Sequence, residues 1–322
     1  MENFSNNYSS QRAFIRESSN EEVDYSAHQS LVMSLLNNKL ISFCIILSLI
    51  VFFGVVVGEK SKIFSRFIPT LRGEIVLSDG YVITSIDHKY PILIKKSDPR
   101  IGYQLRYKGT VDSRFDEAAL NLYMRGDTVV EVGAHYGYNS IMIGQALRMG
   151  GRYIAIEGNP GVSRCLYKNI ILNDLSDTVE IVRKAVSDHQ GTCAIDDLIS
   201  AVPDEEGKHS IVTRTVTVEC DSLDEILKDK KVSLILINLP SSLFTILKGA
   251  QRILNESRNL QILARLNIAK IAKTIDVRKE LNLLRQRGLR FYEVTSPSEI
   301  KEVFVDEIIS KKKLVILMKK DR

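Results

Sequence analysis

The stretch Asp127-Thr-Val-Val-Glu-Val-Gly-Ala-His-Tyr-Gly137 decides the fold of this chain. It is a short apolar strand that ends around the acid Glu131 and continues into a turn with glycines at Gly133 and Gly137. Glycine in such a turn lets the backbone approach a ligand where any Cβ would collide. A second strand, Arg152-Tyr-Ile-Ala-Ile-Glu157, ends in another acid, where a doubly wound sheet presents a carboxylate to ribose hydroxyls. The two segments together predict a site for an adenosine-containing cofactor.

The spacing of the turn indicates which cofactor is expected. The dinucleotide pattern G-x-G-x-x-G does not fit, because His135 stands where a glycine is needed for the approach of a pyrophosphate. S-adenosylmethionine contains no phosphate, so a turn with one glycine fewer suits it. A doubly wound domain that uses the same turn for another nucleotide stays open as the alternative.

Six short motifs occur in the order found in FkbM-type methyltransferases, which the chain resembles over roughly residues 92–267. They are Gly126-Asp127, Glu131 to Tyr138, Ile156 to Pro160, Lys168 to Asn173, Ala185 to Asp188, and Leu247 to Ala250. The resemblance implies a class I methyltransferase fold, a Rossmann-like doubly wound α/β sheet that is mostly parallel with an antiparallel last strand. It also implies methyl transfer from S-adenosylmethionine, usually to an oxygen of a sugar or other small metabolite. The cofactor-binding positions that it implies are Glu131, Gly133, Ala134, His135, Gly137, Glu157, Gly158, Asn159, Ala185 and Asn238.

The chain departs from the family pattern after the fourth strand. The family has a stretch like Lys-Ile-Asp-x-Glu-Gly-x-Glu, and residues 236–243 here are Leu-Ile-Asn-Leu-Pro-Ser-Ser-Leu. On the fifth strand, Arg265 stands where the family tends to have a glutamate. Asn238 has no basic carboxylate and cannot replace an aspartate as proton acceptor. Two hypotheses follow: the enzyme works on a different acceptor, or it has lost catalysis and keeps a cofactor-binding or interaction role.

The remaining candidates for a catalytic group are Asp188, Asn238 and His135. Asp188 and His135 also have simpler interpretations, as a loop-capping or adenine-side residue and as a variable loop position. The triplet Asn238-Leu239-Pro240 is similar to the N-x-P-aromatic signature of adenine amino-methyltransferases. Ser241 stands where that signature has its stacking ring, so no nucleic-acid partner is expected.

Composition excludes several other classes of function. The chain has 322 residues, and its 44 basic and 39 acidic residues give a net charge of +5, which argues only weakly for a polyanionic partner. Five histidines show no i, i+4 pairing typical of a helical zinc site, so we expect no structural metal. The four cysteines show neither C-x-x-C spacing nor a disulfide framework, and nothing in them requires an oxidising compartment. They are Cys44, Cys165, Cys193 and Cys220.

Residues 40–58 contain no charged side chain and predict a transmembrane helix. At about 1.5 Å per residue such a helix matches the ~30 Å hydrocarbon core. A buried core helix and a cleavable signal peptide are the alternatives. Basic residues are more numerous after the segment (Lys60, Lys62, Arg66 and Arg72) than before it (Lys39), which predicts a globular domain that faces the cytosol. A signal-anchor arrangement with a lumenal domain stays open.

The chain is expected to contain a disordered polar tail (1–39), a transmembrane helix (40–58), a basic linker (59–73) and a methyltransferase domain (74–322). Within the domain, residues 74–112 form a small β lead-in and residues 113–322 the Rossmann-like core. Alternation of strand and helix predicts parallel pairing. Strands are expected at 128–132, 152–157, 178–183, 232–238, 260–266, 289–294 and 313–318, and helices at 138–148, 161–173, 221–228, 242–253 and 276–287. Residues 187–210 show no period and are interpreted as an insertion or flap near the site.

Overall fold

The computed structural model describes residues 74–77, 79–99, 101–111, 114–203, 209–296 and 299–320. All of them lie in one compact unit, Lys62–Arg322. The predicted tail, transmembrane helix and linker lie outside the described residues. Within the described ranges, no helix combines the length and the apolar character that crossing a membrane requires.

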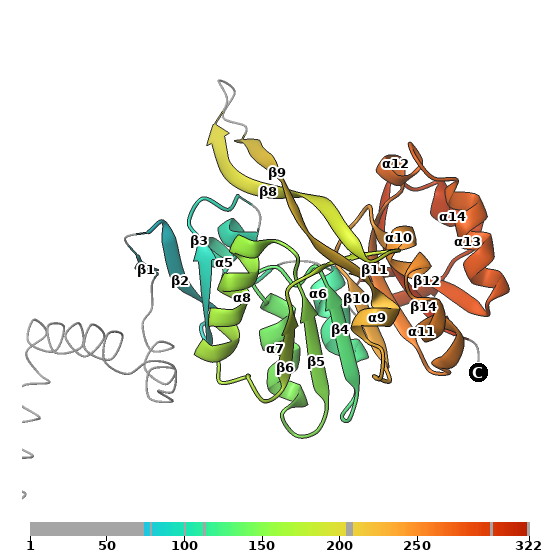
Figure 1. Cartoon of the computed structure of the whole chain (residues 1–322), viewed down its shortest axis with the longest axis horizontal. Helices are drawn as coiled ribbons and strands as arrows, with labels where there is room; N and C mark the ends of the chain where they lie inside the picture. Colours follow the sequence, from blue (N-terminus) through green and yellow to red (C-terminus); the bar gives the residue numbers. More distant parts are fainter. Residues whose placement is uncertain are drawn as a thin grey trace, which may run out of the picture. The chain divides into compact units, whose positions relative to one another are not determined.

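An eight-stranded sheet forms the centre of the unit, with the strand order β13-β12-β14-β11-β10-β4-β5-β6 (Figure 1). Strands β11, β10, β4, β5 and β6 pair in parallel, and β14 runs antiparallel to both β11 and β12. The Rossmann-like fold with a mostly parallel sheet is thereby confirmed. The bounds are β4 Thr128–Val132, β5 Arg152–Ile156, β6 Val179–Val182, β10 Leu234–Ile237, β11 Gln261–Asn267, β12 Leu289–Ser296, β13 Glu299–Glu302 and β14 Lys313–Lys320.

Helices cover both faces of the sheet because its strands alternate apolar side chains between two cores. In β4, for example, Val130 and Val132 pack in one core and Val129 in the other. The first core includes side chains from α9 Leu223–Ile226, α10 Leu243–Lys248, α11 Gln251–Glu256, α12 Ile268–Ile271, α13 Val277–Gln286 and α14 Val305–Ile309. The second includes α5 Ile101–Lys108, α6 Arg114–Leu122, α7 Tyr138–Leu147 and α8 Pro160–Leu172.

The predicted β lead-in is an antiparallel meander of β1 Ile75–Val76, β2 Tyr81–Ile86 and β3 Tyr90–Lys95. Asn169 of α8 holds β3 in place: its Oδ1 accepts a hydrogen bond from the Leu93 amide (2.6 Å) and its Nδ2 donates to the Leu93 carbonyl (2.9 Å). Asn173 donates to the Pro91 carbonyl (2.8 Å). The asparagines of the Lys168-to-Asn173 motif therefore dock the lead-in on the core.

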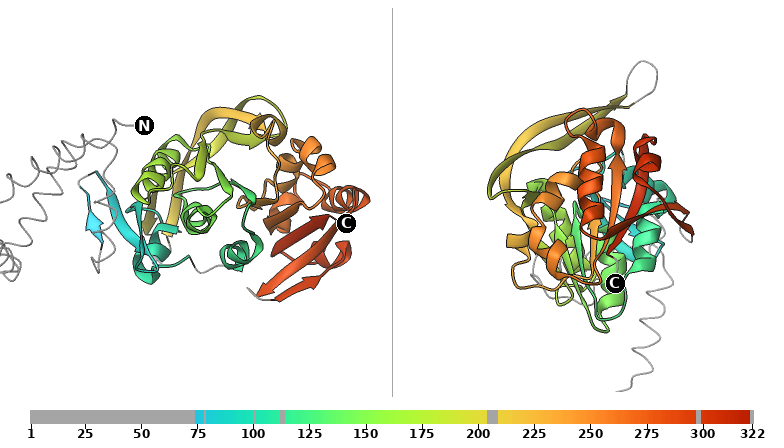
Figure 2. Two further views of the ribbon diagram at one scale, coloured as in Figure 1. Left: turned by 90° about the horizontal axis from the view of Figure 1, so that it is seen from below. Right: turned by 90° about the vertical axis from the view of Figure 1, so that its right-hand side faces the viewer.

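Residues 187–210, interpreted as an insertion or flap near the site, lie mostly in a long hairpin whose two strands the sequence did not predict. Strands β8 Gly191–Pro203 and β9 His209–Ser222 pair antiparallel, and β7 Ala185–Ser187 pairs parallel with β9. Figures 1 and 2 show β8 and β9 as one curved ribbon that projects from the core. A two-stranded ribbon buries little apolar surface, which explains why its sequence has no strong hydrophobic period.

Two smaller differences concern short elements and the division of one helix. The helix expected at 242–253 is divided into α10 and α11 at Gly249, where a Cβ would lie 2.3 Å from the Ser187 carbonyl oxygen. Helices α5, α12 and α14 and strand β13 had not been predicted. They are short, with at most eight residues each, and short elements carry little periodic signal.

Candidate functional site

The glycine turn after β4 lies at the carboxyl edge of the sheet, bonded to the end of β5. The amides of Gly133 and Ala134 donate to the carbonyl of Ile156 at 2.9 and 3.1 Å. Three turn residues have positive φ: Gly133 (83°), His135 (55°) and Gly137 (90°). This left-handed backbone turns the chain sharply from the strand into α7.

The carboxylate of Glu157 joins this turn to the turn that follows β5. Its Oε2 accepts a hydrogen bond from the backbone amide of His135 (2.9 Å), and its Oε1 accepts one from the amide of Asn159 (2.8 Å). A carboxylate has about four acceptor positions, so each oxygen retains capacity for a further donor. Glu157 is thus a partly buried acceptor fixed between the two turns, and its role in binding ribose stays a prediction.

Packing gives a second reason for the two glycines of the turn. A Cβ at Gly137 would lie 2.6 Å from Cδ1 of Leu166 in α8, and one at Gly133 would lie 2.9 Å from the side chain of Leu239. We expected the glycines to make room for a ligand. In the described structure a Cβ at either position would press on a leucine side chain, so packing and the positive φ both favour glycine, and the approach of a ligand stays a prediction.

The positions Gly158, Ala185 and Asn159 lie around the second turn. A Cβ at Gly158 would come within 2.9 Å of the Ala185 amide nitrogen, so these two segments are in close backbone contact. The side chain of Asn159 caps α8 by accepting from the amides of Gly161 and Val162, and its Nδ2 donates to Asp197 of β8 (2.8 Å). Asn159 therefore has a structural role, because its side chain caps the start of α8 and joins the hairpin strand β8 to that helix end.

Glu131 has a different environment from Glu157, because its carboxylate is buried inside the unit. It accepts hydrogen bonds from Asn139 (2.9 Å), Ser140 (3.2 Å) and the Tyr153 hydroxyl (2.7 Å). Burial raises the pKa of the Glu131 carboxyl to about 7, against the lowering effect of these bonds. Glu131 thus positions the first turn of α7 relative to β4 and β5.

A second buried network connects β10, β11 and α6. Arg265 donates from Nε to Oδ1 of Asn238 (2.6 Å) and from Nη2 to Oδ2 of Asp116 (2.9 Å). Its guanidinium also lies over the ring of Phe115, 4.6 Å from the centroid. Asp116 is 2% exposed, and burial lowers the pKa of Arg265 while Asp116 opposes that shift. Asn139 donates to both Asp116 and Glu131, so the two networks share one amide group.

The other two catalytic candidates are in separate places. The imidazole Nε2 of His135 lies 3.7 Å from Oδ2 of the buried Asp98, near the lead-in. Asp188 follows β7, and its Oδ1 lies 2.8 Å from Nδ1 of the neighbouring His189. This hydrogen bond lowers the pKa of the Asp188 carboxyl. The turn of Asp188 lies against Gly249, where a Cβ would be 3.2 Å from the Asp188 Cα.

Sequence reasoning missed several polar residues of this edge. His189 could have been found, because it directly follows Asp188 and a carboxylate beside a histidine is a recognisable acid–base pair. Asp116 and Tyr153 gave no signal, since their partners are remote in sequence. A disulfide joins Cys193 and Cys220, although their spacing matched no framework.

Comparison with known proteins adds the following. Residues 131–290 match the family model described as the methyltransferase FkbM domain. Similar solved structures include a precorrin-6y C5,15-methyltransferase from Geobacter metallireducens, with 13% identity, coverage of 66% of this chain and 89% of that chain, and a TM-score of 0.37. They also include a SAM-dependent methyltransferase from Aquifex aeolicus, with 13% identity, coverage of 69% and 93%, and a TM-score of 0.38. A search of curated proteins found no match.

Proposed function

Since residues 131–290 make this chain a member of the FkbM methyltransferase family, we propose that it methylates an oxygen of a sugar or other small-molecule acceptor while anchored in a membrane. Membership already makes it a methyltransferase that uses S-adenosylmethionine. The acceptor class and the anchor are our proposal. The observation that carries the acceptor is the Asp188–His189 pair, because an alcohol must lose a proton during methyl transfer.

The residues of the site fit S-adenosylmethionine. Glu157 keeps acceptor capacity on both oxygens and would bind the ribose hydroxyls. Oδ1 of Asn139, in the first turn of α7, is buried without a hydrogen-bond partner, and it would accept from the cofactor's ammonium group. When bound, the cofactor supplies an electrophilic methyl group on its sulfonium.

We assign proton removal to His189, positioned by Asp188. The carboxylate accepts from Nδ1–H, so Nε2 becomes the basic atom of the ring. The His189 side chain is 60% exposed, which allows an acceptor to reach it. Asn238 has no such role, because its oxygen accepts from Arg265.

A second candidate is a protein that binds the cofactor without transferring methyl, as a membrane-tethered interaction module. The observation in its favour is that Arg265, Asn238 and Asp116 are bonded to one another where the family tends to carry acids. A site so arranged offers no carboxylate base at β10 or β11.

One experiment separates the two candidates. The full chain, purified in detergent, is titrated calorimetrically with S-adenosylmethionine and then incubated with the methyl-labelled cofactor and extract from its own cells. We expect micromolar binding, equivalent to about −8 kcal/mol, and a labelled small molecule. The variant Glu157→Gln should weaken binding about tenfold or more, whereas the exposed Glu256→Gln is the matched control. Binding of S-adenosylmethionine without any labelled product supports the interaction module. The absence of S-adenosylmethionine binding overturns both the methyltransferase and the interaction module.

The membrane anchor at residues 40–58 and a domain facing the cytosol complete the proposal. The flanking charge supports this orientation. The Cys193–Cys220 disulfide weighs toward the lumenal alternative, because disulfides persist mainly in oxidising compartments. Protease added to the cytosolic side of sealed membranes distinguishes the two orientations. Digestion of the domain supports the cytosolic orientation, and protection of the domain until detergent is added contradicts it.

A further inference from the structure

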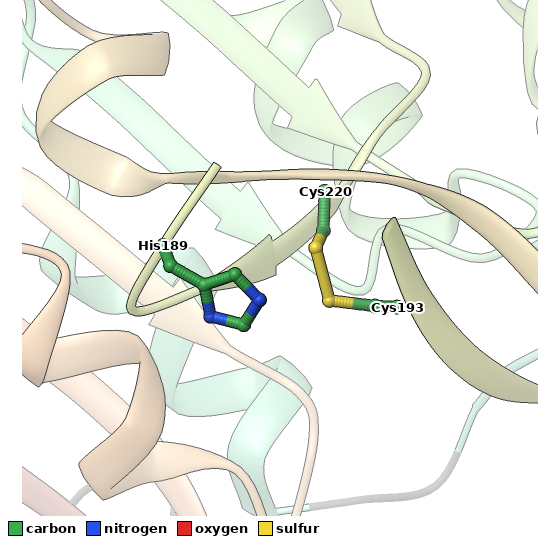
Figure 3. A group of neighbouring side chains, drawn as sticks. All are labelled: His189, Cys193 and Cys220. Carbon is green, nitrogen blue, oxygen red and sulfur yellow. A yellow bond between two sulfur atoms is a disulfide. The ribbon is translucent and has the colours of Figure 1, made fainter. Parts of the chain in front are cut away.

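Three side chains that bind soft metals meet at the base of the hairpin (Figure 3). His189 lies in the turn between β7 and β8, Cys193 in β8 and Cys220 in β9. One ligand atom from each of the three lies within 4.8 Å of the others. The cluster takes no part in binding the methyl donor as described above, although His189 also belongs to the proposed acid–base pair.

The two sulfurs are joined in a disulfide that crosses the hairpin diagonally. In the strand register Cys220 is opposite Gly191, and Cys193 is opposite Val218. The Cα atoms of the two cysteines are 5.7 Å apart. Pairing of the surrounding strand residues keeps the two thiols adjacent when the sulfur–sulfur bond is broken.

Hydrogen bonds orient the histidine toward the sulfurs. Its Nδ1 lies 2.8 Å from Oδ1 of Asp188 and 3.2 Å from Oγ of Ser187. Because the carboxylate accepts from Nδ1–H, the lone pair of the ring lies on Nε2. Figure 3 shows one ring nitrogen turned toward the disulfide and the other away from it. A carboxylate that holds one nitrogen while the other is presented to a ligand is the usual arrangement behind a metal-binding histidine.

We propose that reduction of this disulfide creates a Zn²⁺ site formed by Nε2 of His189 and the thiolates of Cys193 and Cys220. The disulfide accepts two electrons and two protons from a dithiol reductant, which becomes a disulfide itself, and the metal then displaces the two thiol protons. Imidazole and thiolate are preferred zinc ligands. Water completes the tetrahedral coordination. The same sulfurs cannot form a disulfide and bind zinc, so the two states exclude each other.

The geometry suits this ion. Zinc–sulfur bonds of about 2.3 Å and zinc–nitrogen bonds of about 2.0–2.1 Å place ligand atoms roughly 3.5–4 Å apart in a tetrahedron. The three ligand atoms now lie within 4.8 Å of one another, so small side-chain movements would bring them to these distances. Cys220 is buried, Cys193 is half-buried and His189 is exposed, so the ion can enter from the histidine side.

The ligand spacing explains why the sequence predicted no metal. His189 and Cys193 are four residues apart, but they lie in a turn and a strand, not on one face of a helix, and Cys193 and Cys220 do not have C-x-x-C spacing. Only the hairpin register brings the second cysteine to the first.

Cobalt spectroscopy on the full chain tests the proposal. The chain is purified in detergent with Cys44→Ser, reduced with a phosphine, which becomes a phosphine oxide, and titrated with Co²⁺ without oxygen. We expect one equivalent to bind with a thiolate-to-cobalt charge-transfer band and tetrahedral d–d bands, both removed by Zn²⁺. The oxidised chain should show neither band. A reduced chain without the charge-transfer band, or a band that persists in Cys193→Ser, overturns the proposal.

Variants that keep both cysteines guard against an effect of misfolding. His189→Ala changes a side chain that is 60% exposed and should weaken Co²⁺ binding at least tenfold. The exposed His88→Ala is its matched control and should bind as the parent does. Equal affinity in both histidine variants contradicts a role for His189. Because the readout is metal binding, the result does not depend on methyl transfer.

Discussion

The carboxyl edge of the sheet has two halves that hold their polar groups differently. On the β4–β5 half, Glu157 is fixed by backbone amides and keeps free acceptor capacity. On the β10–β11 half, Arg265 and its partners Asn238 and Asp116 are side chains that bond one another. The first half carries the residues for which we propose binding of the methyl donor, whereas the second has a paired arginine at β11 where the resembled family tends to have an acid. Cofactor binding and acceptor chemistry should therefore respond separately to substitution.

The largest effect is expected from Arg265→Met on the β10–β11 half. It leaves the carboxylate of Asp116, 2% exposed, without its guanidinium partner, which should lower the free energy of unfolding by about 3–5 kcal/mol. Urea unfolding of the parent and the variant measures the difference in the free energy of unfolding. The control Arg290→Met breaks an exposed pair with Glu302 and should cost less than about 1 kcal/mol. Equal losses in the two variants would show that the buried pair has no special role.

Glu131→Gln should change the pH dependence of stability on the β4–β5 half. The folded pKa of Glu131 is about 7 and its ordinary value is 4.5, so the fold favours the protonated acid. The stability that the protonated acid contributes is fully present below pH 4.5 and is lost as the pH rises through 7. The total change in the free energy of unfolding is about 3 kcal/mol. Glutamine cannot titrate, and its unfolding free energy should fall less between pH 4.5 and pH 8. Parallel pH profiles for parent and variant would contradict the assignment.

Gly137→Ala tests whether the glycine turn is required by packing. Both Gly137 and Gly126 have a φ of 90°, but a Cβ lies 2.6 Å from Leu166 only at the former, and at Gly126 nothing lies within 4 Å. Backbone strain from a Cβ at this positive φ should by itself lower the free energy of unfolding of each variant by about 1–2 kcal/mol. We expect Gly137→Ala to lose about 1 kcal/mol more than Gly126→Ala in urea unfolding. If Gly137→Ala loses no more unfolding free energy than Gly126→Ala, Leu166 moves aside and packing does not require the glycine.

The smallest effect on stability is expected from Asn238→Asp, which restores the acid found in the family. The new carboxylate would face the Arg265 guanidinium, now shared with Asp116, and stability should change by less than about 1 kcal/mol. Calorimetry should show unchanged affinity for S-adenosylmethionine, because Glu157 is untouched. A marked loss of that affinity would mean that the two halves are coupled.

The sequence predicted the central strands closely and the hairpin poorly, for one physical reason. Strand β4 has the predicted bounds, 128–132, because a parallel strand buried on both faces must be an apolar run. The β8–β9 hairpin has no such requirement, and residues 187–210 were interpreted only as an insertion or flap without predicted strands. The site divides in the same way. Glu157 and the glycine turn could be located from local sequence, but Arg265 and Asp116 are separated by 149 residues.

From its sequence alone, the chain could be assigned to its family and fold, and Glu157 could be proposed as the donor-binding acid, because these depend on short motifs within single strand–turn–helix units. Only the tertiary structure determined which groups are neutralised, capped or cross-linked. Glu131 accepts hydrogen bonds from α7 and β5, Asp116 of α6 is paired with Arg265 of β11, and Cys193 meets Cys220 through strand register. Such contacts depend on distance in space, which local sequence patterns do not encode.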